Sequence, residues 1–193
     1  MKRHYFLLIA SLAIFSACSS STSAPLDVTF PNAVYLNNVS NLYEVTSSNQ
    51  SVDLTWKDSN GVLRKLSDYH GKVILVTFWK SSQDTSDLQI SSLDSAAAEM
   101  PDSLRAVGVA TDNATYSSSF KTVSTYVLSH SVKLQVIVDS TGIAQGQFIQ
   151  FSSDHAPGAP QTFVLDTAGS VHAILNGFAN KNELEATVRN AFK

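Results

Sequence analysis

Hydrophobic and polar residues alternate along this chain with two different periods, and these periods predict strands and helices in turn. The strict alternation over 52–56 predicts a half-buried strand, and a return strand over 62–66 follows an Asn-Gly turn. The nearly unbroken apolar runs Val73–Trp79 and Leu104–Ala110 predict strands that are buried on both faces. The pattern therefore predicts a central pair of buried strands preceded by a hairpin.

Apolar residues three and four positions apart mark the helices between these strands. One stripe predicts a helix from Asp84, which we expect to be its N-cap, to Met100, and a second stripe predicts a helix over 116–127. The remaining elements are a strand at 134–138, a short helix within 143–151, strands at 161–166 and 170–176, and a last helix capped by Asn180. Strands that alternate with helices predict an α/β fold, with a central mixed β-sheet flanked by helices.

We expect this domain to occupy residues 51–193. The stretch before it, residues 26–50, is polar with few apolar positions, and we interpret it as an N-terminal arm that packs on the domain. Within the arm, the alternation of Val28 and Phe30 around Thr29 predicts a short strand.

The first residues of the chain predict export. A short basic stretch precedes an apolar run that ends at Phe15, which is too short to cross a bilayer, so residues 1–17 have the pattern of a signal peptide. Two small residues separate Cys18 from this run, and its position resembles that in the lipobox of bacterial lipoproteins. That resemblance implies a lipid on Cys18 and a flexible tether over 18–25. The alternative is ordinary secretion with cleavage nearby and a free thiol.

A lipid on Cys18 implies an extracytoplasmic, membrane-anchored protein. Because Ser19 rather than Asp follows the cysteine, the sorting rule of such lipoproteins implies the periplasmic side of the outer membrane in a diderm cell. The net charge of -3 gives no electrostatic reason to bind nucleic acid. The histidines show no metal-binding spacing and no phosphate-binding motif is present, so we expect no metal and no cofactor.

Four segments in order carry a family resemblance. They are Leu66–Val73 (LSDYHGKV), Val76–Ser82 (VTFWKSS), Val136–Asp139 (VIVD) and Gly158–Asp166 (GAPQTFVLD). Their spacing resembles that of the TlpA/ResA-like thioredoxin family of exported and membrane-tethered proteins, over roughly residues 50–193. The resemblance implies a thioredoxin-like fold, and it implies that Pro160 is the cis-proline that faces the active-site helix in this family.

The two redox cysteines of that family are missing. Their positions are held by Gln83 and Ser86, and the single cysteine of the chain lies outside the domain. Thiol–disulfide exchange needs a thiolate and a second thiol, which an amide and a hydroxyl cannot replace. Thr77 stands where thioredoxins often have a buried acid, and Gln89 stands where the family often has Glu. The same cysteine count excludes the peroxidase chemistry of peroxiredoxins, so we expect no catalytic residue.

A peptide groove without redox chemistry is the functional interpretation of these changes. Trp79, Ala159 and Pro160 are the candidate residues for binding an extended peptide of an envelope protein, although Trp79 and Pro160 could also serve packing and loop shape alone. The alternative function is that of the family, a thiol–disulfide oxidoreductase in envelope redox or cytochrome c maturation. A hydrolase that pairs Ser86 with His155 is a further alternative, because His155 is the histidine we expect nearest to this corner.

Overall fold

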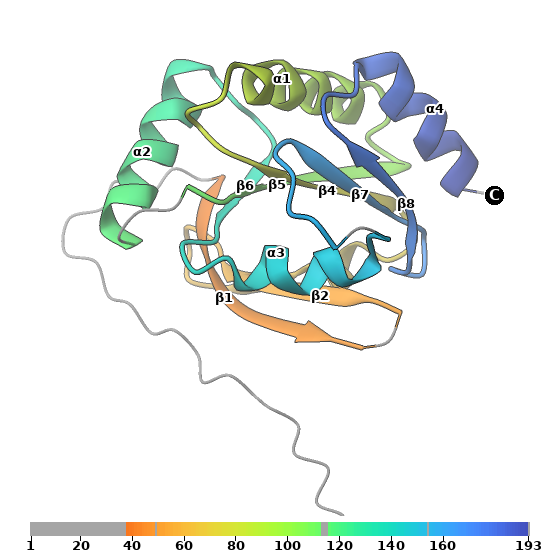
Figure 1. Cartoon of the computed structure of the whole chain (residues 1–193), viewed down its shortest axis with the longest axis horizontal. Helices are drawn as coiled ribbons and strands as arrows, with labels where there is room; N and C mark the ends of the chain where they lie inside the picture. Colours follow the sequence, from red (N-terminus) through yellow and green to blue (C-terminus); the bar gives the residue numbers. More distant parts are fainter. Residues whose placement is uncertain (1–37, 49, 113–115, 154, 193) are drawn as a thin grey trace, which may run out of the picture.

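In the computed structural model, the described residues 38–48, 50–112, 116–153 and 155–192 form one eight-stranded sheet between helices (Figure 1). The strands are β1 (Val39–Ser47), β2 (Val52–Lys57), β3 (Leu63–Lys65), β4 (Val73–Trp79), β5 (Leu104–Ala110), β6 (Gln135–Val138), β7 (Gln161–Leu165) and β8 (Val171–Asn176). Their order in the sheet is β3-β2-β1-β6-β5-β4-β7-β8. The mixed sheet flanked by helices is a thioredoxin-like arrangement, as predicted.

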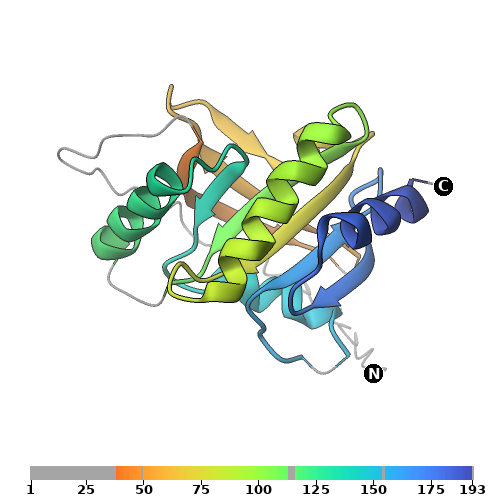
Figure 2. The same cartoon turned by 90° about the horizontal axis from the view of Figure 1, so that it is seen from above.

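Four α-helices cover the two faces of the sheet. They are α1 (Asp84–Glu99), α2 (Tyr116–Ser129), α3 (Ile143–Phe148) and α4 (Lys181–Ala191), and two 3₁₀ turns lie at Leu66–Tyr69 and Ile149–Phe151. Helices α1, α2 and α4 lie on one face and α3 lies on the other (Figure 1), and α1 crosses the middle of the sheet when it is seen from above (Figure 2). No helix in the described ranges has the length and apolarity needed to span a bilayer.

Each face of the sheet has its own hydrophobic core. On the α1 side, Leu93 of α1 and Val188 of α4 pack over Leu75 of the central strand. On the α3 side, Phe148 of α3 packs against Phe78 of β4, with ring centroids 5.3 Å apart. Strand β4 contributes to both cores, and this is why its run of apolar residues is unbroken.

Strand β1 changes the expectation of an N-terminal arm that packs on the domain. Residues 39–47 do not pack on the domain from outside. They form a strand inside the sheet, antiparallel to β2 and parallel to β6. The side chain of Asn38 secures the start of β1 by donating to the carbonyls of Val132 (2.7 Å) and Leu134 (3.1 Å). The domain therefore begins before residue 51, and the strand predicted around Val28 lies outside the described residues.

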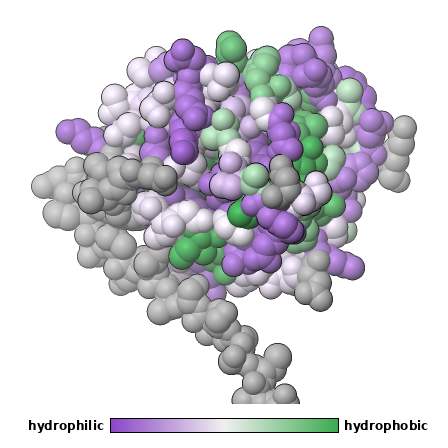
Figure 3. All heavy atoms as spheres, viewed as in Figure 1, coloured by the Kyte–Doolittle hydropathy of each residue, from purple (hydrophilic) through white to green (hydrophobic). Residues whose placement is uncertain are grey.

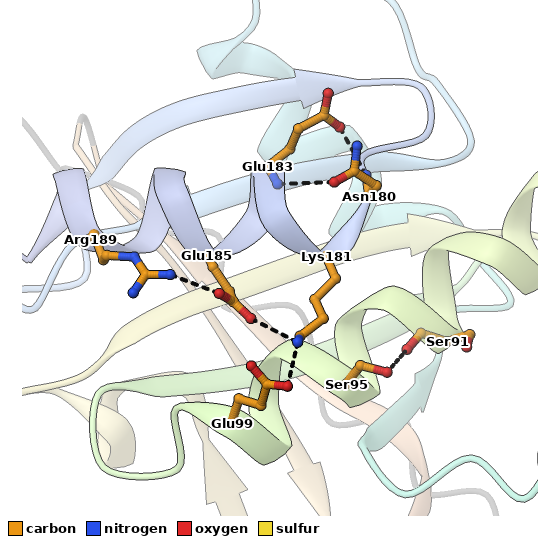
Figure 4. Close-up of polar contacts among 8 residues, drawn as sticks. All are labelled: Ser91, Ser95, Glu99, Asn180, Lys181, Glu183, Glu185 and Arg189. Atoms are coloured by element: carbon orange, nitrogen blue, oxygen red, sulfur yellow. Dashed lines mark hydrogen bonds and ion pairs between the residues drawn. The ribbon is translucent and has the colours of Figure 1, made fainter.

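The start of α1 also differs from the prediction. The N-cap is Gln83 rather than Asp84, and its side chain makes no capping hydrogen bond, so Asp84 is the first residue of the helix. At α4 the predicted capping box is confirmed: the Glu183 amide donates to Asn180 Oδ1 (3.2 Å) and the Asn180 amide donates to Glu183 Oε2 (2.9 Å) (Figure 4).

Candidate functional site

The candidate site is the corner where β4 passes into α1. The connecting loop is attached to the end of β5 by Asp112, whose Oδ1 accepts hydrogen bonds from the amide (3.1 Å) and the hydroxyl (2.6 Å) of Ser81. Two bonds to one carboxylate restrain the loop in position and direction. The N-terminus of α1 is therefore held over the C-terminal edge of the central strands.

A second loop reaches this corner from β7. The peptide bond between Ala159 and Pro160 is cis, as predicted. Phe78 of β4 pairs with Gln161 of β7, and this register places Pro160 beside the end of β4. The Pro160 carbonyl accepts from the amide of Gly177, which follows β8 (2.9 Å). Three segments that are distant in sequence therefore meet here: the β4–α1 loop, the Pro160 loop and the β8–α4 loop.

Gln83 and Ser86, the predicted replacements of the family cysteines, lie one turn apart at the start of α1. The amide of Ser86 donates to the carbonyl of Gln83 (2.9 Å), and the Ser86 side chain is completely buried. Its hydroxyl oxygen accepts only a long hydrogen bond from the amide of Lys80 (3.4 Å). No described base lies within hydrogen-bonding distance of this hydroxyl, so Ser86 has the position of a nucleophile without its activation.

No hydrogen bond joins His155 to Ser86 among the described residues. The ring of His155 contacts the carbonyl of Ile149 (3.2 Å), and the residue is exposed. A second histidine, His130 at the end of α2, lies near the start of α1, with Nε2 3.8 Å from Asp87 Oδ2. The structure therefore shows no Ser86–His155 pair of the kind a hydrolase would need.

Behind the corner lies a buried polar network that carries no charge. The hydroxyls of Thr77 and Thr162 are 2.8 Å apart, and the side-chain amide of Gln89 donates to Thr162 Oγ1 (3.4 Å). Gln89 Oε1 in turn accepts from the backbone amide of Ala179 (2.8 Å). The side chains of Thr77, Gln89 and Thr162 are completely buried. The network thus joins β4, β7, α1 and the β8–α4 loop.

The sequence identified two members of this network and missed the one between them. Thr77 and Gln89 were noted because they replace acids of the family. Thr162 drew no attention, although the GAPQT segment and the pairing of β7 with β4 place it directly opposite Thr77. An argument from the antiparallel pairing of β7 with the distant strand β4 could have found it.

Trp79 is placed differently from the expectation of a groove-lining residue. It is completely buried, its ring lies 4.8 Å from that of Tyr126, and a Cβ at Gly108 would lie 3.0 Å from its Nε1. In this conformation it packs under the corner and does not line its surface. Pro160 is also buried, whereas Ala159 is partly exposed. Ala159 is therefore the accessible member of the three candidates.

A surface depression of about 370 Å³ lies on the opposite side of α1, against the end of α2. Burial, together with a hydrogen bond to Asp87, raises the pKa of Tyr126 well above its ordinary value. The His130 ring stacks on Tyr126 with a centroid distance of 4.1 Å. These contacts bind the start of α1 to the end of α2, so Asp87 is engaged away from the Pro160 loop.

No group of three histidine, cysteine or acidic side chains in the described part of the chain is arranged to hold a metal ion. Cys18 lies outside the described residues.

The sheet order, the proline loop and the start of α1 define a protein with a thioredoxin-like fold, and no cysteine lies in the described part of the chain. The sequence matches the AhpC/TSA family over residues 48–174, and the chain belongs to that family. The predicted relationship to the redoxins is confirmed. No curated protein matches the chain.

Solved structures with the same fold are distant in sequence. A thiol:disulfide interchange protein of the thioredoxin family from Chlorobium tepidum is 17% identical with a TM-score of 0.64, covering 76% of this chain and 97% of that one. A putative DsbE from the same organism is 20% identical (TM-score 0.61, 77% and 99% covered). The exposed lipoprotein thioredoxin of Streptococcus pneumoniae is 22% identical (TM-score 0.59, 72% and 98% covered). At these identities the likeness is one of fold.

Proposed function

We propose that this protein is a lipid-anchored, extracytoplasmic thioredoxin-like domain that binds extended peptide segments of envelope proteins beside Ala159, without redox chemistry. The observation that carries the proposal is the corner itself. Its framework is complete, with the Pro160 loop, the start of α1 and the β8–α4 loop tied together, while positions 83 and 86 hold no thiol. A framework kept in this form suits a role in binding.

The groups available to a peptide are backbone groups at Ala159. Pro160 has no amide hydrogen, and its carbonyl is already paired with Gly177. No described residue hydrogen-bonds to the backbone N–H or C=O of Ala159, which lies outside strand β7. An extended chain can bind such free groups by main-chain hydrogen bonds, as in strand addition.

A large apolar residue is exposed on the loop that is bonded to Pro160. Phe178 directly follows Gly177 and is 44% exposed, although the amides on either side of it are bonded, one to Pro160 and the other to Gln89. A large apolar side chain held at the surface on this loop favours a peptide with an apolar side chain at the contact.

Peptide binding is tested with a permanently unfolded protein, such as carboxymethylated lactalbumin, as the probe for the full chain. We expect Ala159→Trp to abolish binding because the indole fills the space beside the free backbone groups. Ala98→Trp, at an exposed position on the far side of α1, is the matched control and is expected to bind normally. Equal binding by both variants would show that the probe binds elsewhere.

The absence of redox chemistry is tested by insulin reduction. The full chain is expected to give no turnover above a boiled control, because its one cysteine lies at position 18. Turnover above that control would favour the alternative oxidoreductase function instead.

The lipid anchor is supported by the unique cysteine shortly after the apolar run, and the pneumococcal structure is an example of this fold in a protein described as an exposed lipoprotein. We expect Cys18→Ser to block processing and palmitate labelling, while Ser23→Ala in the tether leaves both unchanged. Labelling that persists in Cys18→Ser would exclude Cys18 as the attachment point.

A further inference from the structure

The depression between α1 and the end of α2 has the size of a small-molecule site but an unusually polar lining. Its volume of about 370 Å³ lies within the range of roughly 300–1,000 Å³ in which proteins bind small ligands. Such sites are mostly apolar, whereas this one is lined by two carboxylates (Asp87, Asp94), two serine hydroxyls (Ser91, Ser95) and the ring of His130. In Figure 3, residues that are hydrophilic or of intermediate hydropathy cover the upper left, where the start of α1 meets the end of α2 in Figure 1. The lining therefore favours a polar ligand.

One wall of the depression is a single face of α1. Asp87, Ser91, Asp94 and Ser95 recur three or four positions apart, so they lie in neighbouring rows on that face. Both serines are exposed. The hydroxyl of Ser95 donates to the Ser91 carbonyl (2.9 Å, Figure 4), and its oxygen can still accept a hydrogen bond. This wall therefore presents hydroxyl and carboxylate groups together.

The two carboxylates of this wall are already paired, but they are not saturated as acceptors. Asp94 accepts from the backbone amides of Leu134 (Oδ1, 2.7 Å) and Lys133 (Oδ2, 2.9 Å). Asp87 accepts from the hydroxyl of Tyr126. An ionised carboxylate can accept about four hydrogen bonds, so each keeps free capacity. Lys133 also lines the depression, and its positive charge disfavours a cationic ligand. A neutral ligand rich in hydroxyl groups fits these acceptors better.

The facing wall carries the ring of His130. This ring stacks on Tyr126 with a centroid distance of 4.1 Å, and the His130 side chain is 46% exposed. Nδ1 lies 3.0 Å from the Tyr126 carbonyl, which can only accept, so in the neutral ring Nδ1 carries the hydrogen and Nε2 is an acceptor. Nε2 and Asp87 Oδ2 are 3.8 Å apart, which is too far for a hydrogen bond between them. Two neighbouring hydroxyl groups of one ligand can donate to these two acceptors.

We propose that this depression binds a saccharide. A sugar ring has the two features that the walls require: neighbouring hydroxyl groups that donate to the acceptors of Asp87 and His130, and an apolar C–H face that packs on the exposed imidazole ring. Ile90 and Val132, which also line the depression, supply apolar contacts beside it. The inference is independent of the proposed peptide binding, because it uses no residue of the Pro160 loop.

Binding is measured by amide NMR titration of the full chain carrying Cys18→Ser, with glucose and its dimer cellobiose as probes. We expect saturable shifts of the Lys133 and Leu134 amide resonances, because a hydroxyl that donates to Asp94 weakens the bonds these amides make. Tighter binding of the dimer identifies a glycan chain as the source of the sugar ring, and equal binding identifies a free sugar. Shifts that are absent with both sugars at their highest soluble concentration, or that appear only with the cation spermidine, would overturn the proposal.

Two tryptophan variants separate this site from the corner. Ala98 is exposed and lines the depression, so Ala98→Trp should fill the space and abolish the shifts, whereas Ala159→Trp should leave them unchanged. The expected results with the peptide probe are the reverse, so failure of one proposal is distinguishable from failure of the other. Equal sugar binding by both variants, with circular dichroism showing that both are folded, would overturn the saccharide site.

The aromatic wall is tested separately. His130→Ala removes the ring and one acceptor and should weaken sugar binding several-fold. Leu128→Ala, at a 61% exposed position near the same end of α2, is the matched control and should bind sugar normally. Equal affinities of these two variants would contradict the role of the imidazole ring and overturn the proposed mode of binding.

Discussion

The two ends of helix α1 are held by different chemistry. At its N-terminal end the buried amide of Gln89 links the Thr162 hydroxyl to the Ala179 amide, and none of these groups is charged. At its C-terminal end Glu99 pairs with Lys181 of α4, and Glu185 and Arg189 extend the ion pairs along α4 (Figure 4). One end is neutral and buried, and the other is charged, with Glu99 exposed and Glu185 buried.

The difference follows from where each end lies. A charge taken out of water must be compensated by excellent geometry, whereas a neutral amide needs only its hydrogen-bond partners. Gln89 finds a partner for both its oxygen and its nitrogen, so this buried network needs no ionisable group. The exposed pair of Glu99 with Lys181 keeps its hydration and is screened by salt, so it contributes little. Glu185 is buried between Lys181 and Arg189, and its charge is compensated by these two partners.

The largest change in activity is expected when two thiols replace the side chains of Gln83 and Ser86. Gln83→Cys combined with Ser86→Cys, in a chain carrying Cys18→Ser, places two sulfurs across one helical turn and should convert an inactive protein into a weak insulin reductase. The helix N-terminus lowers the pKa of the first thiol, and the negative charges of Asp84 and Asp87 oppose that shift.

Disulfide formation in this double variant is measured directly, by mass after thiol alkylation. Two thiols that stay free under strong oxidant would mean that positions 83 and 86 do not correspond to the cysteine pair of the family. Activity of either single cysteine variant would point to a different mechanism.

Removing the Gln89 amide should cost the most stability. In Gln89→Leu the Ala179 amide and the Thr162 hydroxyl both lose a buried partner, and we expect a loss of about 3 kcal/mol in the free energy of unfolding. Gln145→Leu is the matched control, since its amide makes one half-buried bond to the Gly158 carbonyl, worth about 1 kcal/mol. Denaturant unfolding measures both, and equal losses would show that the buried link has no special importance.

Gln89→Glu should make the stability depend on pH. Burial raises the pKa of a carboxyl at this position above its unfolded value of about 4.3. A group whose folded-state pKa is raised is most favourable below its unfolded pKa, and its contribution is lost as the pH rises through the folded value. The stability deficit against the natural chain should therefore grow from pH 4 upward. A constant deficit between about pH 4 and 8 would mean that water reaches residue 89.

The smallest effect is expected at the charged end. A hydrogen bond from Lys181 lowers the pKa of Glu99 below its ordinary 4.5, so this pair stabilises the fold above that pH and is lost as the pH falls through the folded-state value. We expect Glu99→Gln to lose less than Gln145→Leu, and to lose nothing measurable in high salt. A larger loss that persists in salt would place the pair among the main restraints on α1.

Long apolar runs made the centre of the fold predictable. Strands β4 and β5 have the predicted ends because burial on both faces leaves an unbroken pattern that needs no partner to be seen. Strand β1 was not predicted, because its polar sequence shows no clear strand pattern. Its partner β6, which lies beside it in the sheet, is far away in the sequence. The start of α1 was assigned to Asp84, a good N-cap by residue type, but the loop held by Asp112 places Gln83 there.

For the candidate site, the sequence located the corner but could not show which of its side chains are buried. The absence of thiols and the place of Pro160 were predicted from short motifs, and such local patterns can be recognised without three-dimensional information. Whether a side chain at the corner faces inward or outward depends on what packs beneath it. Tyr126 covers Trp79 from α2, and for this reason Trp79, for which both groove lining and packing were open, is completely buried.

Strand β1 also sets the order in which this chain can fold as it is synthesised. Strand β1 leaves the ribosome shortly before β2, and the two strands can pair as a hairpin at once. On its other side β1 pairs with β6. The side-chain amide of Gln135, which donates to the Asn38 carbonyl, lies 97 residues further along the chain. The sheet therefore stays open on that side until β6 has followed, and its closure is a long-range event of the kind that makes folding slow and exposes unpaired strands to aggregation.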